Sequence, residues 1–310
     1  YVFGPLFSSL ELVDYVKDRK LVDGIIMSEI ESVIMDIIER KSTKPLPGVY
    51  CLSSDQDYIC ENPTRKLADM EGLPFLAYDL VDYKKIDRFI IQSSRGCPLA
   101  CNYCPYYLSQ GSKFRAMSPR RIVDELRNLS ENFGANNVLI HDAIFTLDKI
   151  RVVEFCKLLI EEKLNIKWEC ETHMQHLDAD LISLMYDAGN RKIGFGIESA
   201  SEEVLKRAKR KFINWDRIKE NVNVCKSLGI KTTAFFILAL SGDTVQGALD
   251  TIKLAMELKT DTCHFNLPSL YPGTGAYSNA IEEGYIDKRS SKEEVYDIWS
   301  SHTPNNPSLT

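Results

Sequence analysis

The feature that most limits the fold of this chain is a regular alternation of strand-like and helix-like segments between Asp87 and Glu283. Short apolar runs rich in β-branched residues alternate there with longer segments of helical periodicity, an order typical of a parallel sheet or barrel. We count six strand–helix units, whereas a complete eight-fold barrel takes roughly 250 residues. The sequence therefore predicts an α/β fold with a partial, six-stranded (β/α)6 barrel of the TIM type.

The barrel strands are expected at 88–93, 137–141, 166–172, 192–198, 231–240 and 261–268. Helices are expected at 118–134, 147–162, 178–189, 201–207, 215–228, 244–258 and 274–283. Ser118 and Asp178 are typical N-cap residues, and Gly134 and Gly229 are typical of the position just after a helix. These signals set the helix ends in the prediction.

The first part of the chain has a different pattern, which resembles the end of a doubly wound unit. Strands are expected at 1–3 and 23–27, and helices at 10–17 and 29–40. Residues 44–87 contain four prolines and little periodicity, so an irregular connection is expected there. The predicted domains are the C-terminal part of a Rossmann-like unit at 1–50, a linker at 51–86, the barrel at 87–285 and the start of a C-terminal extension at 286–310. A chain that starts at Tyr1 is expected to be a fragment of a longer protein.

Three cysteines follow the first barrel strand, in the sequence Cys97-Pro-Leu-Ala-Cys101-Asn-Tyr-Cys104. In such barrels the chemistry lies on loops at the C-terminal ends of the strands. Thiolates at this spacing can converge on an iron–sulfur cube, in which each binds one iron. Three ligands for four irons leave one iron open to a substrate. The alternatives are buried free thiols or zinc, which normally takes four protein ligands; an expected helix separates the nearest histidine, His141, from this loop.

The other cysteines are scattered over loops, helices and strands, and we expect them to be small buried apolar groups. They are Cys51, Cys60, Cys156, Cys170, Cys225 and Cys263. Nine cysteines without a visible secretory signal indicate a reducing compartment, so a cytoplasmic protein is expected.

The composition argues against two classes of partner. Hydrophobic residues make up 44% and charged residues 26% of the chain, which is typical of a globular protein. No apolar run approaches the ~20 residues of a membrane-spanning helix. The net charge is −6 and no dense Lys/Arg stripe is present, which argues against a nucleic-acid partner.

Side chains alternate along a strand, and three barrel strands each have one face that carries polar residues or glycines instead of apolar residues. These residues are Glu169, Glu171, His173, Gly194, Gly196, Glu198, His264 and Asn266. Buried carboxylates are costly unless paired, and a positively charged ligand inside the barrel would offset that cost. Glu171 and Glu198 are therefore expected to contact a cofactor, with internal salt bridges as the alternative. His173 and His176 could form a metal pair, although packing or substrate contacts are favoured.

These motifs resemble the radical S-adenosylmethionine (SAM) superfamily. The match is Cys97-x-x-x-Cys101-x-Tyr103-Cys104 after a first strand, with an aromatic residue before the last cysteine. Four further segments resemble the cobalamin-binding branch of that family: Ser94-Arg-Gly-Cys-Pro98, Ile193-Gly-Phe-Gly-Ile-Glu-Ser199, Phe235-Phe-Ile-Leu238 and Tyr271-Pro-Gly-Thr274. The resemblance covers nearly all of residues 75–285.

The resemblance implies that the three cysteines bind a [4Fe–4S] cluster whose open iron holds the amino and carboxylate groups of SAM. One electron then cleaves SAM to methionine and a 5′-deoxyadenosyl radical, which abstracts hydrogen from an unactivated carbon. By resemblance, Tyr103 lies by the adenine, Glu198 contacts the bound cofactor, Arg210 meets the methionine carboxylate and Asp142 lies near the methionine amine. Lys211 stands where the family often has glycine.

The resemblance also implies cobalamin as a cofactor, because residues 2–31 look like the last part of the branch's cobalamin-binding domain. Two differences are visible. Ser28-Glu-Ile-Glu31 stands in place of a Gly-Glu-Gly-Glu-like turn. The sequence also lacks the Asp-x-His-x-x-Gly element with which some relatives ligate cobalt.

The function that the resemblance implies is methyl transfer from methylcobalamin to an unactivated carbon of a small-molecule substrate. An external one-electron reductant of the flavodoxin or ferredoxin type would supply the electron. Within the family the alternatives are ring formation or rearrangement, and methylthiolation, which would need a second cysteine-bound cluster. Outside the family the alternative is a non-catalytic zinc-binding module. The sequence identifies neither the substrate nor a catalytic side chain.

Overall fold

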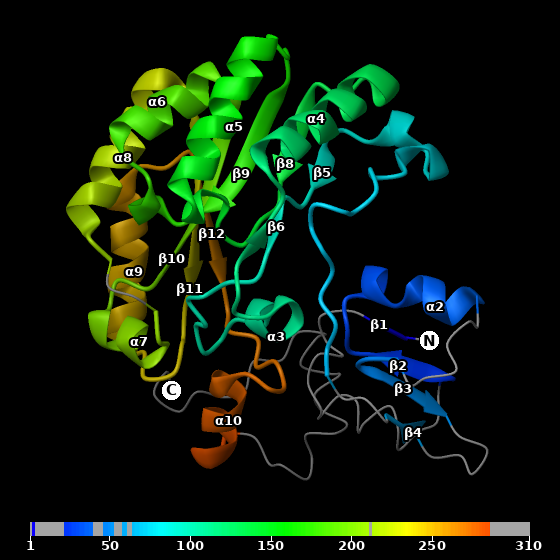
Figure 1. Cartoon of the computed structure of the whole chain (residues 1–310). Coiled ribbons are helices and arrows are strands. Elements are labelled where there is room, and N and C mark those ends of the chain that lie inside the picture. The colour runs from blue at the N-terminus through cyan, green and yellow to red at the C-terminus, as the bar shows by residue number, and fades with distance from the viewer. Residues whose placement is uncertain are drawn as a thin grey trace.

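The computed structural model describes residues 2–3, 22–39, 46–52, 58–60, 64–210 and 213–285. The helix expected at 10–17 lies outside the described residues. Figure 1 shows a large sheet covered by helices and, beside it, a smaller sheet built from the first part of the chain.

The large sheet has six strands, which are all parallel and follow one another in space in their sequence order. They are β5 (Phe89–Ile91), β8 (Asn137–Ile140), β9 (Lys167–Thr172), β10 (Asn190–Glu198), β11 (Lys231–Ile237) and β12 (Thr262–Asn266). Strands β5 and β12 lie at the two edges and do not pair with each other. The predicted α/β fold with a partial, six-stranded parallel barrel is therefore confirmed.

Helices connect the strands and cover one face of the sheet, as Figure 1 shows. They are α4 (Pro119–Phe133), α5 (Lys149–Glu162), α6 (Ala179–Asp187), α7 (Glu202–Arg207), α8 (Trp215–Leu228) and α9 (Val245–Leu258). Helix α10 (Gly275–Glu282) follows the last strand and lies at the bottom of the view in Figure 1. Ser118 accepts a hydrogen bond from the Arg121 N–H at 3.1 Å, and Asp178 accepts one from Leu181 at 3.0 Å. Gly134 and Gly229 end their helices in the left-handed conformation. The predicted helix ends are thus confirmed.

The main core lies between this sheet and its helices. Trp168 of β9 is fully buried, and its ring meets Phe145 and Phe155 edge to face, with ring centroids 5.5 and 5.4 Å apart. The Trp168 indole N–H donates to the Ala188 carbonyl at 2.8 Å, so the one polar atom of the ring is satisfied. The opposite face of each strand is left to line the inside of the barrel.

The small sheet has the order β1-β2-β3-β4. Its strands are β1 (Val2–Phe3), β2 (Gly24–Ile26), β3 (Val49–Leu52) and β4 (Tyr58–Ile59), and β2 is followed by a 3-10 helix (Ile30–Ser32) and α2 (Ile34–Glu39). Strand β1 is parallel to β2, as a doubly wound unit requires, but β3 and β4 are antiparallel. The prediction that residues 44–87 are irregular is wrong for β3 and β4, because Pro47 precedes β3 instead of interrupting it.

A short hairpin, separate from both sheets, encloses the three cysteines. Strand β6 (Ser94–Arg95) pairs antiparallel with β7 (Arg115–Ala116). Together they close the segment 94–116, which also contains α3 (Tyr106–Gln110) and is called here the cysteine loop. In Figure 1, α3 lies between the ends of the barrel strands and the small sheet. The sequence did not predict this hairpin.

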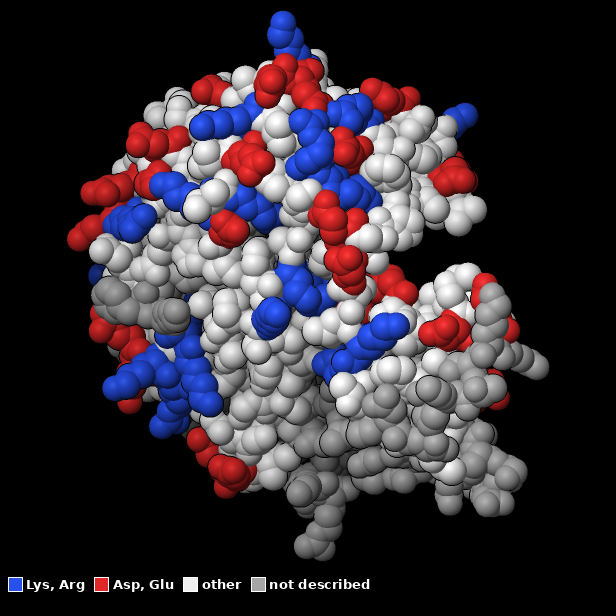
Figure 2. Space-filling view, in the orientation of Figure 1, with Lys and Arg blue, Asp and Glu red and all other residues white. Residues whose placement is uncertain are grey.

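Two expectations from the composition concern membrane-spanning helices and the distribution of charge on the surface. In the described part of the chain, no helix combines the length and the apolar character that crossing a bilayer requires. Figure 2 shows acidic and basic side chains intermixed over the helical face that is in view. The charges on that face therefore do not form one extended basic stripe.

Candidate active site

The cysteine loop is tightly folded by its own backbone. The Cys97 N–H donates to the Gly111 carbonyl at 3.1 Å, and the Cys104 N–H donates to the Cys101 carbonyl at 3.1 Å. Gly96 has φ +85°, and a Cβ atom at this position would lie 2.1 Å from the Lys113 carbonyl oxygen. Only glycine can therefore stand directly before the first cysteine.

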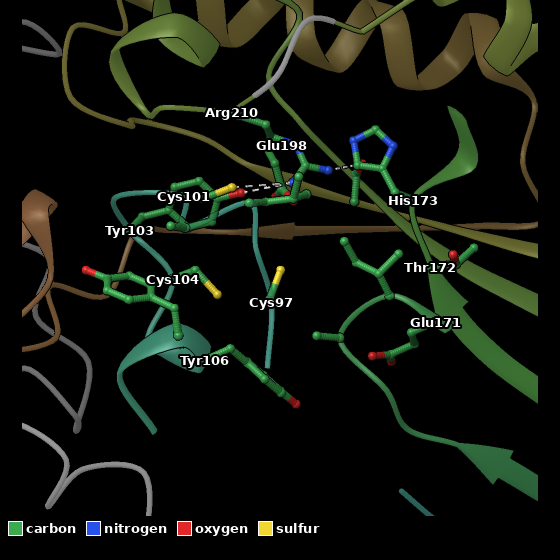
Figure 3. Close-up of a pocket in the computed structure, with 16 residues that line it drawn as sticks. Cys97, Cys101, Tyr103, Cys104, Tyr106, Glu171, Thr172, His173, Glu198 and Arg210 are labelled. Carbon is green, nitrogen blue, oxygen red and sulfur yellow. Dashed lines mark hydrogen bonds and ion pairs between the residues drawn. The ribbon is translucent and has the colours of Figure 1, made fainter. Parts of the chain in front are cut away.

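The three cysteine side chains line a common cavity of ≈ 200 Å³ at the C-terminal ends of β9 and β10. Figure 3 shows the thiols on one side of this cavity and the end of β9, with Glu171, Thr172 and His173, on the other side. All three cysteines are free thiols. The structure thus brings Cys97, Cys101 and Cys104 together at the position where barrels of this kind carry their chemistry.

The thiols fit an iron–sulfur cluster better than they fit zinc. In a zinc site all ligands bind one ion, whereas each cysteine of a [4Fe–4S] site binds a different iron. Among the described residues, no three His, Cys, Asp or Glu side chains are arranged to hold a single metal ion. Burial raises the pKa of the Cys97 thiol, and it raises the pKa of Cys104 to about 11.

A buried cation stands beside the thiols. The Arg210 guanidinium donates to the Gly196 carbonyl at 2.6 Å, and its Nη1 lies 3.6 Å from the Glu198 carboxylate and 4.0 Å from the Cys101 sulfur. Nη1 also donates to the Tyr103 hydroxyl at 3.4 Å. Among the described residues, the buried Nε of Arg210 has no hydrogen-bond partner. This side of the cavity therefore offers a positive charge and an unused N–H to an anionic group.

The carboxylate of Glu198 is held in place by an unusual backbone. Glu198 has φ +72°, and the register of β10 shifts between Gly196 and Glu198. A Cβ atom at Gly196 would lie 2.2 Å from Glu198 Oε1 and 3.1 Å from Arg210 Nη2. Burial raises the pKa of Glu198, against the opposing effects of Arg210 and Tyr103. The glycine is therefore needed to leave room for this pair.

The predicted faces of β10 are confirmed. Ile193, Phe195 and Ile197 are buried in the main core, while Gly196 and Glu198 line the cavity. On β9, Glu171 lines the cavity, whereas Glu169 pairs with Arg88 at 2.9 Å. For Glu169 the salt-bridge interpretation is therefore the correct one.

Glu171 takes part in a polar chain that the sequence did not predict. Its carboxylate lies 3.4 Å from Nδ1 of His141, whose Nε2 lies 3.1 Å from the Tyr106 hydroxyl. The contact with Glu171 raises the pKa of His141. Tyr106 also lines the cavity. His141 is thus closer to the cysteine loop than its separation in sequence indicates, because β8 lies next to β5 in the sheet.

Asp142 does not line the cavity. Its side chain is 0% exposed. Its oxygens accept four hydrogen bonds, from the N–H and the hydroxyl of both Ser93 and Ser94, at 2.6 to 2.9 Å. The expectation that this carboxylate contacts the methionine amine is corrected, because all its hydrogen-bonding capacity is used by the strand that leads into the cysteine loop.

None of the other six cysteines, all within the described part of the chain, lines the cavity. His173 lines the cavity, and its ring stacks on that of His176 with centroids 5.5 Å apart. Cys156, Cys170 and Cys225 are buried, as predicted. The prediction is wrong for Cys51 and Cys263, which are exposed, and for Cys60, which is half-buried. Exposure of these cysteines depends on how the strands β3, β4 and β12 are covered, which no sequence pattern indicates.

Cavity residues outside the predicted set are Leu99, Ala100, Tyr106, Tyr107, Ala143, Ile144 and Thr172. Four of them belong to the cysteine loop, two come shortly after the end of β8, and Thr172 is the last residue of β9. Position at the C-terminal end of a barrel strand is the signal that could have identified Ala143, Ile144 and Thr172.

A parallel partial barrel with three thiols on the loop after its first strand defines a class of iron–sulfur proteins. Residues 91–255, more than half of the chain, match the Radical SAM superfamily. The chain belongs to the radical SAM superfamily.

The chain is also similar to two curated proteins and to one solved structure. The uncharacterized methyltransferase PH0819 of Pyrococcus horikoshii is 27% identical over 279 residues, which cover 87% of this chain and 61% of that protein. The anaerobic magnesium-protoporphyrin IX monomethyl ester cyclase of Rubrivivax gelatinosus is 21% identical, over 96% of this chain and 54% of that protein. The chain thus spans between half and two thirds of the length of these curated relatives.

The third comparison is with a solved structure. The radical SAM methyltransferase TsrM from Kitasatospora setae, with cobalamin and a [4Fe–4S] cluster bound, matches with a TM-score of 0.79. The match covers 91% of this chain and 59% of TsrM at 17% sequence identity. At this identity the match shows a shared fold.

Proposed function

We propose that this chain is the central part of a cobalamin-dependent radical SAM enzyme that methylates an unactivated carbon. The observation that carries the proposal is the convergence of three free thiols and a buried arginine on one cavity at the ends of the barrel strands. Two of the similar proteins are named methyltransferases, and one of them has cobalamin and a [4Fe–4S] cluster bound. The support comes from family membership and from the chemistry of the lining residues.

In the proposed enzyme, Cys97, Cys101 and Cys104 hold a [4Fe–4S] cluster, which when bound supplies the electron that cleaves the sulfonium of SAM. Arg210 is proposed to bind the methionine carboxylate. Its charge is buried and its Nε has no partner in the described part of the chain, which is what an anionic ligand requires.

The other lining residues are proposed to orient the ligand and exclude water from it. Tyr103, which contacts Arg210, is proposed to lie by the adenine, and Glu198 to contact the bound cofactor. Glu171, on the opposite side of the cavity, is proposed to accept hydrogen bonds from the polar part of SAM or of the substrate. No cofactor role is proposed for Asp142, because its carboxylate is fully occupied.

We propose that the small N-terminal sheet is the end of a cobalamin-binding unit. The parallel pairing of β1 with β2 supports this assignment, and the antiparallel β3 and β4 depart from it. Because β3 pairs with β2 and β4 pairs with β3, we place the end of this unit near residue 60 instead of residue 50. Residues 64–86 then form the connection and 87–285 the barrel, whereas the extension expected at 286–310 lies outside the described residues.

A second candidate is ring formation or another rearrangement by an enzyme of the same branch. It is favoured by the similarity to the magnesium-protoporphyrin cyclase, which covers 96% of this chain. Methylthiolation is less well supported, because Cys156, Cys170 and Cys225 are buried in the core and do not line the cavity. Under either candidate a small-molecule substrate and an external one-electron reductant of the flavodoxin or ferredoxin type are proposed.

Replacing one cysteine tests the proposal. We expect Cys101→Ala to abolish the brown colour of the anaerobically reconstituted protein and the formation of 5′-deoxyadenosine from SAM. Cys263→Ala is the matched control, because Cys263 is exposed and does not line the cavity, and it should behave like wild type. Cleavage of SAM at the wild-type rate by Cys101→Ala would refute the assignment. Methyl-labelled SAM then separates the two candidates, since only methyl transfer places label in the product.

A further inference from the structure

The hairpin at the base of the cysteine loop places two like charges opposite each other. Arg95 of β6 and Arg115 of β7 are direct partners in the antiparallel pair, and Arg95 is only two residues from Cys97. Both side chains are largely buried, with exposed fractions of 14% and 16%. Like charges in this relation repel, and buried guanidinium groups need partners. The hairpin therefore depends on acidic groups from elsewhere in the chain.

The first of these acidic groups is Glu29, which follows β2 of the small sheet. Arg115 donates to its two oxygens at 2.6 and 3.0 Å, and Nη1 of Arg95 lies 3.2 Å from it. The Ala68 N–H donates to the same carboxylate at 2.7 Å. The Glu29 side chain is 7% exposed, so these contacts are shielded from water. A buried ion pair of this kind stabilises the fold only if its hydrogen bonds are well aligned.

The second group is Glu31, which accepts hydrogen bonds from the two terminal nitrogens of Arg95 at 2.6 and 3.2 Å. The turn Ser28-Glu-Ile-Glu31 thus pairs each hairpin arginine with a carboxylate. Arg65 adds a neighbouring contact: it donates to the Met27 carbonyl at 2.7 Å and also to the carbonyls of Leu108 and Ser109 in the cysteine loop. The small sheet is therefore bonded directly to the loop.

The barrel holds the same hairpin from its other side. Asp142, after β8, binds Ser93 and Ser94 through the four hydrogen bonds described above. Arg151 of α5 donates to the carbonyls of Ser93 and Met117, both at 3.1 Å, and so joins the two flanks of the hairpin. The loop is thus anchored twice, once by the barrel and once by the turn after β2.

We propose that Glu29 and Glu31 are positioning residues for the cysteine loop, so that the cluster site takes its final geometry only when the small sheet is docked. The two carboxylates act through Arg95 and Arg115, and touch neither the thiols nor the cavity. Any change in the N-terminal unit that displaces this turn is transmitted to Cys97 through Arg95 and Gly96. The connection to a cluster rests on the proposed function, whereas the connection to the loop does not.

Hydrogen exchange of the metal-free protein tests the connection to the loop. In Glu29→Gln we expect peptides from residues 94–116 to exchange roughly tenfold faster or more, while peptides from β8 to β11 stay unchanged. Glu162→Gln is the matched control, because Glu162 also accepts from two arginines, Arg120 and Arg127, but lies on α5. If Glu29→Gln does not fold, Glu31→Gln carries the test, since Glu31 is more exposed. Unchanged exchange in the loop would overturn the proposal.

Two further variants separate positioning from general stability. If Glu29 acts through Arg115, the double variant Glu29→Gln/Arg115→Gln should accelerate exchange of the loop no more than either single variant does. Glu29→Asp keeps the carboxylate and should restore much of the protection. Additive effects of the two single changes, or no rescue by aspartate, would contradict the proposal.

The amount of iron bound after anaerobic reconstitution then connects the loop to the proposed function. We expect Glu29→Gln to retain less iron per chain than wild type and Glu162→Gln to retain the same amount. Faster exchange of the loop with unchanged iron content would show that the two glutamates do not position the cluster ligands. Wild-type protein that binds no iron would instead refute the proposed function and leave the exchange result standing.

Discussion

At the scale of single residues, the cavity shows why Gly196 precedes Glu198 on the inner face of β10. Glu198 adopts a left-handed backbone, which costs of order 1–3 kcal/mol for a residue with a Cβ atom. The burial of its carboxylate beside Arg210 requires this bend, and the absence of a side chain at Gly196 makes room for it. Backbone strain at this position is therefore associated with the proposed SAM site.

Gly196→Ala tests this interpretation. The added methyl group would lie 2.2 Å from Glu198 Oε1, so the carboxylate and Arg210 must move. Loss of a hydrogen bond to a charged group costs about 1.5–3 kcal/mol, and we expect 5′-deoxyadenosine formation to fall by roughly tenfold or more. Gly72→Ala is the control, because Gly72 lies in an exposed turn and its nearest contact would be 3.4 Å away. Equal rates for both variants and wild type would contradict the role of this pair.

Which residues form the cavity could be predicted where the signal is local, and not where it depends on another strand. The three cysteines lie within one loop, so their spacing predicts their convergence. Asp142 stands at the expected end of β8, but the hydroxyl groups that bind its carboxylate belong to residues 93 and 94, beyond the neighbouring strand β5. Sequence alone gives the position of such a side chain and not its direction.

At the scale of secondary-structure elements, prediction succeeded for long segments with caps and failed for short paired ones. The helices α4, α6 and α8 begin and end as their cap residues indicate. Strands β3, β4, β6 and β7 have two to four residues each, too few for a periodic pattern. Their existence depends on tertiary partners, such as the acidic turn that neutralises the β6–β7 hairpin.

The N-cap of α4 gives a stability prediction at this scale. The Ser118 hydroxyl accepts from the Arg121 N–H and donates to Glu71. We expect Ser118→Ala to lower the free energy of unfolding by about 1 kcal/mol, the usual cost of losing such a cap. Ser227→Ala, at an exposed position in the last turn of α8, should change it by less than about 0.5 kcal/mol. Urea unfolding of the two variants checks this, and equal stabilities would contradict the assigned cap.

At the scale of the whole molecule, the six-stranded sheet and the small N-terminal sheet meet at the cysteine loop. The barrel supplies the cavity, and the small sheet supplies the carboxylates that neutralise Arg95 and Arg115. The chain spans between half and two thirds of the length of the curated relatives that it matches. The described residues account for the cluster site and its anchoring.

The contact between the two sheets predicts a pH dependence of stability. Burial alone would raise the pKa of Glu29, but the hydrogen bonds from Arg115 and Ala68 and the charge of Arg95 lower it below its ordinary value of 4.5. A carboxylate with a lowered pKa in the folded state stabilises the protein fully above its unfolded pKa, and this contribution disappears as the pH falls through the folded pKa.

We therefore expect the difference in the free energy of unfolding between wild type and Glu29→Gln to be largest at neutral pH. The difference should shrink as the pH falls below 4.5. Denaturant unfolding of both proteins over this range measures it, and comparing the pair removes the titration of other carboxylates. A difference that does not vary with pH would contradict the ion pair.

The central claim is that Cys97, Cys101 and Cys104 hold an iron–sulfur cube with one open iron. Metal and acid-labile sulfide analysis of the full-length protein, purified and reconstituted without oxygen, tests it most directly. The account predicts about four irons and four sulfides per chain, as one cube contains, and their loss in Cys101→Ala but not in Cys263→Ala. Zinc without sulfide in the wild-type protein, or iron retained by Cys101→Ala, would contradict it.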